Sequence, residues 1–242
     1  MENAETYKLV YLARRARTVS REDWPRTWRS HAIFASQFPA LEANISWLRY
    51  CNRIEQPAID GVPVQLPQLS TEHDGVAVAA SPTLTGINGG GFSAEDQARI
   101  DEDERRVFDM LTPNFTYFAV ESLVKQGPLG KAALFHFLPR ATGLAREEFA
   151  DRYRGEHAAA ASRGSAQIKG LTRAVLNHPV HESLPLFAFD GISEFWFETA
   201  DDAVSALAEG ALDDVFNDAQ ALCAPGGIVQ VLTSVSHRWS DM

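Results

Sequence analysis

The sequence predicts an α+β protein made of two similar βαββαβ units. The main observation is an internal repeat, because the segment from Val19 to His31 (VSREDWPRTWRSH) reappears from Leu144 to His157 (LAREEFADRYRGEH). Each copy follows an apolar run that ends in arginine, at Arg15 and at Arg140. A period of about 120 residues is too long for a solenoid, so each copy is expected to be a domain-sized unit.

The correspondence continues downstream of the repeated segment. Asn52 in the first copy matches Asn177 in the second, and an Asp-Gly pair at Asp74 matches one at Asp190. A Gly-Pro-Leu-Gly segment at 127–130 has the composition of a linker. We therefore expect a tandem duplication with two domains, residues 1–126 and residues 127–242.

Hydrophobic periodicity gives the elements of the first unit. Ser20 is expected to cap a helix that carries Trp24 and Trp28 on one face and stops at Pro39. A Pro-rich loop follows at 55–68. The expected strands are 7–14, 44–51, 75–80 and 115–124, and a second helix, with a heavily charged exposed face, is expected at 94–110.

The second unit repeats this order with shorter connections. Its expected strands are 132–138, 168–176, 191–198 and 228–236, and its expected helices are 146–162 and 200–221. A βαββαβ unit is the ferredoxin-like arrangement, in which two helices cover one face of the sheet. Two fused ferredoxin-like domains would bury their free faces against each other and form an intramolecular α+β barrel.

Composition restricts the class of protein. A net charge of −10 disfavours a nucleic-acid partner, which needs a clustered basic surface. No apolar run approaches the 18 or so residues of a membrane span, and the acidic N-terminus does not resemble a signal peptide. Two cysteines provide neither a disulfide framework nor a metal-binding pattern. We expect a soluble cytoplasmic protein with no membrane partner.

The repeated helix motif has a family resemblance. The sequence Arg146-Glu-Glu-Phe149, followed by Tyr153-Arg-Gly-Glu-His157, resembles the EthD family, which belongs to the dimeric α+β barrel superfamily. The first copy departs by one residue, because three steps separate Trp28 from His31 where the motif has four. The resemblance implies two paired ferredoxin-like units. It also implies chemistry without an organic cofactor, or simple binding, on small hydrophobic molecules that are often aromatic or cyclic.

His157 is the first candidate for chemistry. Phe149, Tyr153 and His157 recur every four residues, so they share the helix face that packs on the sheet. A histidine at the end of that face can act as a general acid or base at a cavity edge. The alternative is a favourable contact with the helix dipole. His31 is its counterpart, and the shortened spacing favours a structural or second-site role.

Histidine and tyrosine residues outside the repeat are further candidates. His136 shares a strand face with Leu134 and Leu138, either as a partner of His157 or as a hydrogen-bonded core residue. Tyr117 offers a hydroxyl, although a core position is the simpler interpretation. We expect His157 and His136 to be catalytic, and the expected substrate-binding residues are Tyr11, His31, Tyr117, Tyr153 and His178.

Other features are interpreted as structural. The acidic run from Asp101 to Glu104 is expected to be a solvated helix face, because calcium loops need alternating ligands and a glycine. No spacing indicates a metal site. The loops at 55–72 and 82–93 break the repeat symmetry and are expected to cover the pocket. Arg14, Arg15 and Arg140 are expected at the surface, with pairing to an anionic substrate as the alternative.

The expected function is a cofactor-independent enzyme that uses histidine acid/base chemistry. The reaction would be of the lyase, dehydratase, isomerase or oxygenase type, acting on a small hydrophobic, aromatic or cyclic catabolic intermediate. One alternative is a non-catalytic small-molecule binding or accessory protein. Another is a haem protein, because other branches of the superfamily use haem. The sequence leaves open whether the two-domain chain forms a homodimer.

Overall fold

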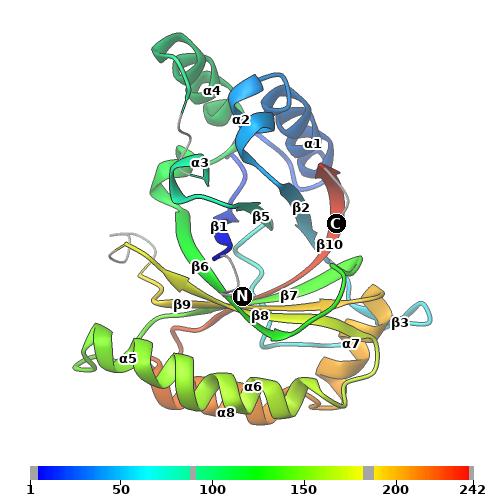
Figure 1. Ribbon diagram of the computed structural model, residues 1–242. Helices are drawn as coiled ribbons and strands as arrows, with labels where there is room; N and C mark the ends of the chain where they lie inside the picture. Colours follow the sequence, from blue (N-terminus) through cyan, green and yellow to red (C-terminus); the bar gives the residue numbers. More distant parts are fainter. Residues whose placement is uncertain (1–4, 88–90, 182–187, 240–242) are drawn as a thin grey trace.

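The centre of the protein is a closed barrel of antiparallel strands (Figure 1). The computed structural model describes residues 5–87, 91–181 and 188–239. We call residues 5–126 the first half and residues 127–239 the second half. The strands of the first half are β1 (Tyr7–Ala13), β2 (Trp47–Arg53), β5 (Gly75–Ser81) and β6 (Thr116–Lys125). Those of the second half are β7 (Ala132–Leu138), β8 (Leu171–Pro179), β9 (Gly191–Phe197) and β10 (Val229–Trp239).

Both halves have the same strand order. Around the barrel the strands run β6-β1-β5-β2 and then β10-β7-β9-β8, so each half places its fourth strand beside its first, then its third and its second. This is the ferredoxin-like order, and the predicted α+β barrel is confirmed. The halves join along two seams, β2 with β10 and β6 with β8. The tandem duplication and the boundary near residue 127 stay predictions.

Helices lie on opposite sides of the barrel, those of each half over their own strands (Figure 1). The first half has α1 (Trp24–Ala35), α2 (Pro39–Asn44), α3 (Leu84–Ile87), α4 (Ala94–Val107) and the 3₁₀ turn η1 (Thr112–Asn114). The second half has α5 (Arg146–Arg152), the π-helical turn η2 (Tyr153–His157), α6 (Ala158–Ser165), α7 (Ala200–Ala208) and α8 (Asp213–Leu222). None of the described helices has the length and apolar character that a membrane span requires. A small hairpin, β3 (Ala58–Ile59) and β4 (Val62–Pro63), lies outside the barrel.

Several element boundaries differ from the prediction. Pro39 does follow the first helix, but it also begins α2, because the first turn of a helix tolerates a residue without an N–H. The predicted helix at 200–221 is two helices, since Gly210 adopts a φ of +69° between α7 and α8. The predicted strand at 168–176 begins only at Leu171 and continues to Pro179.

Alternation along the strands separates two apolar layers. On β7, Phe135 and Phe137 pack inside the barrel with Val10 of β1. Leu134 and Leu138 instead face the helices of the second half. The barrel interior is therefore shared by the two halves, while each half has its own layer between helices and sheet.

The repeated Asp-Gly pair has a structural role in the first half. Asp74 accepts a hydrogen bond from the backbone N–H of Arg15 at 2.9 Å and pairs with the Arg15 guanidinium. A Cβ on Gly75 would lie 2.3 Å from the ring of Trp28, so only glycine leaves room for that ring.

The second half has the same contacts at its own Asp-Gly pair. Asp190 accepts from the backbone N–H of Arg140 at 3.2 Å, and a Cβ on Gly191 would lie 2.9 Å from the ring of Tyr153. The guanidinium of Arg140 also pairs with Asp190. Arg14 pairs with Asp109. These arginines therefore hold strand ends in place, and the alternative of an anionic substrate partner is not supported.

A cluster of charged side chains lies inside the barrel. The ammonium group of Lys8, fully buried on β1, lies 2.8 Å from Glu121 and 3.2 Å from Glu194. Glu194 also accepts hydrogen bonds from Asn177 and Trp196, both at 2.8 Å. Lys8 and Glu121 belong to the first half and Glu194 to the second, so this cluster connects the halves through the barrel interior.

Candidate functional site

An apolar cavity of about 420 Å³ lies between helices α1 and α4 and the outer face of the first-half strands. Its volume is in the range of about 300–1,000 Å³ that is usual for small-molecule pockets. Much of its wall is aliphatic or aromatic, with Leu9, Phe34, Leu48, Ile87, Phe92 and Ile100. The second half completes the wall with Pro179, His181 and Trp239.

His31 is a polar residue in this wall, and it is held by an aspartate. It lies on α1, and its Nδ1 is 2.6 Å from the Asp103 carboxylate on α4. Burial acts to raise the pKa of Asp103, but the hydrogen bonds with His31 and Arg106 hold that pKa below its ordinary value. Because the carboxylate accepts a hydrogen bond from the N–H at Nδ1, Nε2 is the nitrogen left for a ligand. The pair therefore has the arrangement of a positioned general base.

Two tyrosines and a glutamate complete the polar part of the cavity. Trp28 donates to the hydroxyl of Tyr11 at 3.2 Å, and Tyr50, whose ring contacts that of Trp28, also lines the cavity. Glu104 accepts from the backbone N–H and the hydroxyl of Thr112, at 2.9 and 2.6 Å. Burial raises the pKa of Glu104, against the effect of these two bonds.

The second half contains a matching histidine–aspartate pair. His157 Nδ1 is 2.8 Å from Asp218, which lies on α8 as Asp103 lies on α4. The extra residue between Tyr153 and His157 falls in the π-helical turn η2, and such turns accommodate single insertions. His31 and His157 therefore occupy corresponding places. The shorter spacing before His31 therefore does not move it out of register with His157.

His157 and His136 lie in a closely packed layer between helices and sheet. His157 is fully buried and stacks on Tyr153, with ring centroids 5.1 Å apart, and His136 lies 4.6 Å from the ring of Phe216. Neither ring nitrogen of His136 has a hydrogen-bond partner in the described part of the chain. The interpretation of His136 as a hydrogen-bonded core residue is therefore wrong for the residues described. Neither histidine lines the apolar cavity, and their predicted catalytic role stays a prediction.

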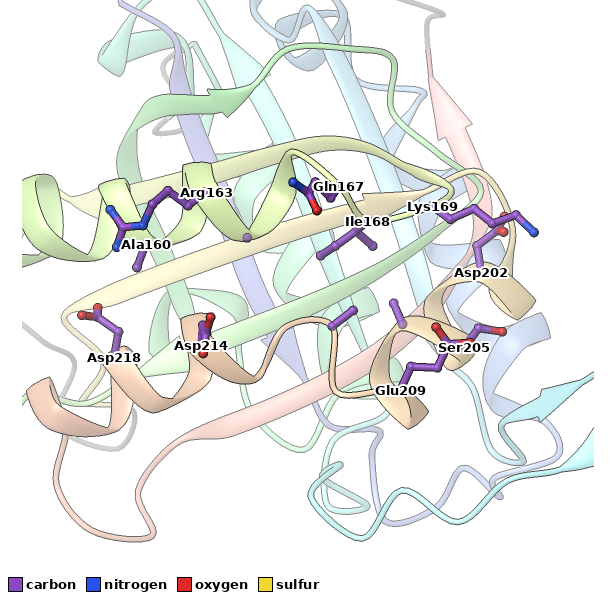
Figure 2. A pocket seen from close by; sticks show the side chains of 13 residues that line it. Ala160, Arg163, Gln167, Ile168, Lys169, Asp202, Ser205, Glu209, Asp214 and Asp218 are labelled. Carbon is purple, nitrogen blue, oxygen red and sulfur yellow. The ribbon is translucent and has the colours of Figure 1, made fainter.

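A second hollow, of about 810 Å³, lies on the outside of the second half (Figure 2). It is a groove between α6, which carries Arg163, and helices α7 and α8. Its lining includes the carboxylates of Asp202, Glu209, Asp214 and Asp218. Through Asp218 the groove reaches the buried His157. Its open, charged wall is unsuited to an apolar ligand.

The structure therefore divides the predicted site residues into two groups. His31, Tyr11 and Tyr117 border the cavity of the first half, although the Tyr117 ring packs on Phe137 and Phe189. The other group lies in the second half: His157, His136, Tyr153 and His178. Tyr153 is hydrogen-bonded to Ser193 and contacts His178. The structure does not bring His157 and Tyr117 together in a single site.

The sequence interpretation missed Asp103, Glu104 and Tyr50. The acidic run at 101–104 was predicted to be a solvated face, yet Glu104 is buried and Asp103 nearly so. A signal was available, because Ile100, Glu104 and Val107 recur at helical spacing and mark the inward face of α4.

The two loops expected to cover the pocket behave differently. In the loop at 82–93, Ile87 and Phe92 line the cavity, while residues 88–90 lie outside the described chain. In the loop at 55–72, Ile59, Val64, Leu66 and Leu69 pack on the second-half core instead. The prediction that the loop at 55–72 covers the pocket is wrong, because its apolar residues are buried elsewhere.

Three histidines whose pKa values are lowered in the folded protein make its stability depend on pH. Burial, with a contribution from His157, lowers the pKa of His136 to about 3. Burial and neighbouring arginines lower the pKa values of His73 and His178 to about 4. Below pH 6.5 the unfolded chain takes up protons that the folded chain excludes, so the free energy of unfolding falls as the pH falls.

Replacement of His136 by leucine should reduce this pH dependence. Between pH 6.5 and pH 5, one histidine that stays neutral in the fold accounts for about 2 kcal/mol. The His136→Leu variant should therefore lose about 2 kcal/mol less than the unmodified protein between pH 7.5 and pH 5, as measured by urea unfolding. The same loss in both proteins would show that His136 takes up a proton in the folded state.

Comparisons with known proteins agree with this architecture. Residues 141–222 match the family profile described as EthD domain. An anthrone oxidase-like protein superimposes with a TM-score of 0.64 at 11% identity, covering 99% of this chain and 94% of that chain. A provisionally assigned monooxygenase from Fusobacterium nucleatum gives a TM-score of 0.57 at 6% identity, with 98% and 95% covered. A provisionally assigned chlorite dismutase gives 0.51 at 12% identity, with 96% and 95% covered. Comparison with curated proteins gives no match.

Proposed function

We propose that the protein, whose residues 141–222 match the EthD domain profile, is an enzyme acting on a small apolar aromatic or cyclic molecule. The substrate binds in the cavity of the first half, and His31, held by Asp103, removes a proton from it. The observation that carries the proposal is the histidine–aspartate pair, 2.6 Å apart, in the wall of an apolar cavity.

The chemistry follows from the positions of the two groups. The Asp103 carboxylate fixes the tautomer of His31 and stabilises the imidazolium that forms when Nε2 accepts a proton. The apolar wall keeps water from the conjugate base of the substrate. This arrangement supports proton abstraction from a carbon or oxygen acid, the first step shared by isomerases and by oxygenases that work without a cofactor.

The name of one structural neighbour suggests the reaction to test first. Anthrone loses a proton from its methylene carbon to give an enolate, which dioxygen can oxidise. The overall conversion of one anthrone and one dioxygen gives one anthraquinone and one water. In this reaction His31 would take the methylene proton, and dioxygen would be the oxidant.

The described lining of the apolar cavity does not fit haem, the group used in other branches of the superfamily. Two haem propionates need cationic partners, but the described lining of the cavity contains no lysine or arginine and includes the carboxylate of Glu104. We therefore derive no step through haem.

A cavity-filling variant tests the proposal. Ala35 lines the cavity on α1, whereas Ile33, two residues earlier, is 49% exposed and is not part of the lining. The unmodified protein should bind anthrone in calorimetry and accelerate its oxygen uptake. Ala35→Trp should abolish both effects, and Ile33→Trp should preserve both. Full activity in Ala35→Trp, or no effect of the unmodified protein on anthrone, would contradict the proposal.

A further inference from the structure

We propose that the cavity selects an uncharged hydroxyarene or the enol of a cyclic ketone, and that Tyr50 donates a hydrogen bond to its oxygen. This inference rests on the proposed function, because it concerns the ligand of the same cavity. It assigns a role to the hydroxyl of Tyr50, on β2. It also defines which charges a ligand can carry.

Tyr11 and Tyr50 both bring a hydroxyl to the polar part of the cavity wall. The indole N–H of Trp28 can only donate, so the Tyr11 oxygen accepts from it at 3.2 Å. Tyr50 is the tyrosine whose ring contacts His31, and its O–H can donate to a ligand in the cavity that both residues line. A donor at this position stabilises negative charge on a ligand oxygen.

His31 supplies the complementary acceptor. Its ring lies 6.4 Å from that of Tyr50, centroid to centroid, at an interplanar angle of 89°. Since Nδ1 is bonded to Asp103, the neutral ring offers Nε2 as an acceptor. A ligand hydroxyl between the two rings would donate to Nε2 of His31 and accept from Tyr50. Aromatic hydroxyl compounds present both functions at one atom, beside an apolar body that suits the rest of the wall.

The charges around the cavity disfavour anionic ligands. The described lining residues include no lysine or arginine, and Glu104 and the His31-bound Asp103 are both acidic. A carboxylate placed in the cavity would lose its hydration without gaining a cationic partner. The same wall accepts an uncharged molecule of equal size.

Three naphthalene probes test this selection. Calorimetry at pH 7 should show that 1-naphthol binds about tenfold more tightly than naphthalene, because one hydroxyl gains two hydrogen bonds. Binding of 1-naphthoate should be at least tenfold weaker than binding of 1-naphthol. Tyr50→Phe should reduce the ratio of the naphthol and naphthalene affinities about fivefold. A purely structural effect of the substitution would weaken both probes equally and leave the ratio unchanged.

Tyr7→Phe is the matched control, because it makes the same chemical change on β1 at a hydroxyl that bonds Glu5 outside the cavity. Its naphthol-to-naphthalene ratio should equal that of the unmodified protein. Equal binding of all three probes, or an unchanged ratio in Tyr50→Phe, would overturn this inference and leave the proposed function standing. Failure of naphthol, naphthalene and anthrone alike to bind would overturn both.

Discussion

Replacement of Lys8 by methionine should lower the free energy of unfolding by about 3–5 kcal/mol, the cost typical of breaking a buried ion pair on one side. Lys8 is fully buried between Glu121 and Glu194, so its removal leaves the Glu194 carboxylate in the barrel interior without its cation, while Glu121 keeps its ion pair with Arg173. Asn177 and Trp196 still donate to Glu194, which limits the loss. Urea unfolding at pH 7 measures the effect.

A double variant and a surface pair serve as controls. Lys8→Met combined with Glu194→Gln should recover part of the stability lost in Lys8→Met, because one uncompensated charge is gone. Arg152→Ala breaks an ion pair with Glu156 at the surface and should cost less than about 1 kcal/mol. Equal effects of Lys8→Met and Arg152→Ala would show that the interior cluster does not stabilise the barrel.

Replacement of His31 by glutamine should lower the turnover of anthrone by about 10²- to 10⁴-fold, the usual contribution of a positioned general base. Glutamine is near histidine in size, and its amide can still donate to Asp103, so the melting temperature should change little. The rate of oxygen uptake at saturating anthrone measures the loss.

His157→Gln is the matched control in the second half, where the same residue type is bonded to Asp218. Because His157 does not line the apolar cavity, turnover should stay within about threefold. Its burial means that the substitution should instead lower stability, by roughly 1–3 kcal/mol. The opposite result, with activity lost in His157→Gln and kept in His31→Gln, would move the active site to the second half.

Much of the fold follows from local patterns in the sequence. The strand alternation around Phe135 places alternate side chains in the barrel and under the helices, as the period of two requires. The repeated Arg, Asp and Gly positions were recognisable because each half needs the same strand-end contact, as at Arg15 and Asp74. Such contacts depend on neighbours within one half.

The site was less predictable because it depends on distances between elements. The sequence shows a histidine at corresponding places in both halves, but not that helices enclose a cavity at His31 and pack closely at His157. The number of residues between Tyr153 and His157 was misleading, because the π-helical turn accommodates the extra residue. Trp239 closes the cavity from the other half, which no local pattern indicates.

The seam between β2 and β10 also bears on the order of folding. It joins residues as far apart as Arg49 and Trp239, whose hydrogen bond spans 190 positions. Contacts of such long range form slowly, because a large loop must close before they are gained. Trp239 is also part of the cavity wall. During synthesis, the ligand pocket of the first half is therefore completed only after β10 has left the ribosome and closed the barrel.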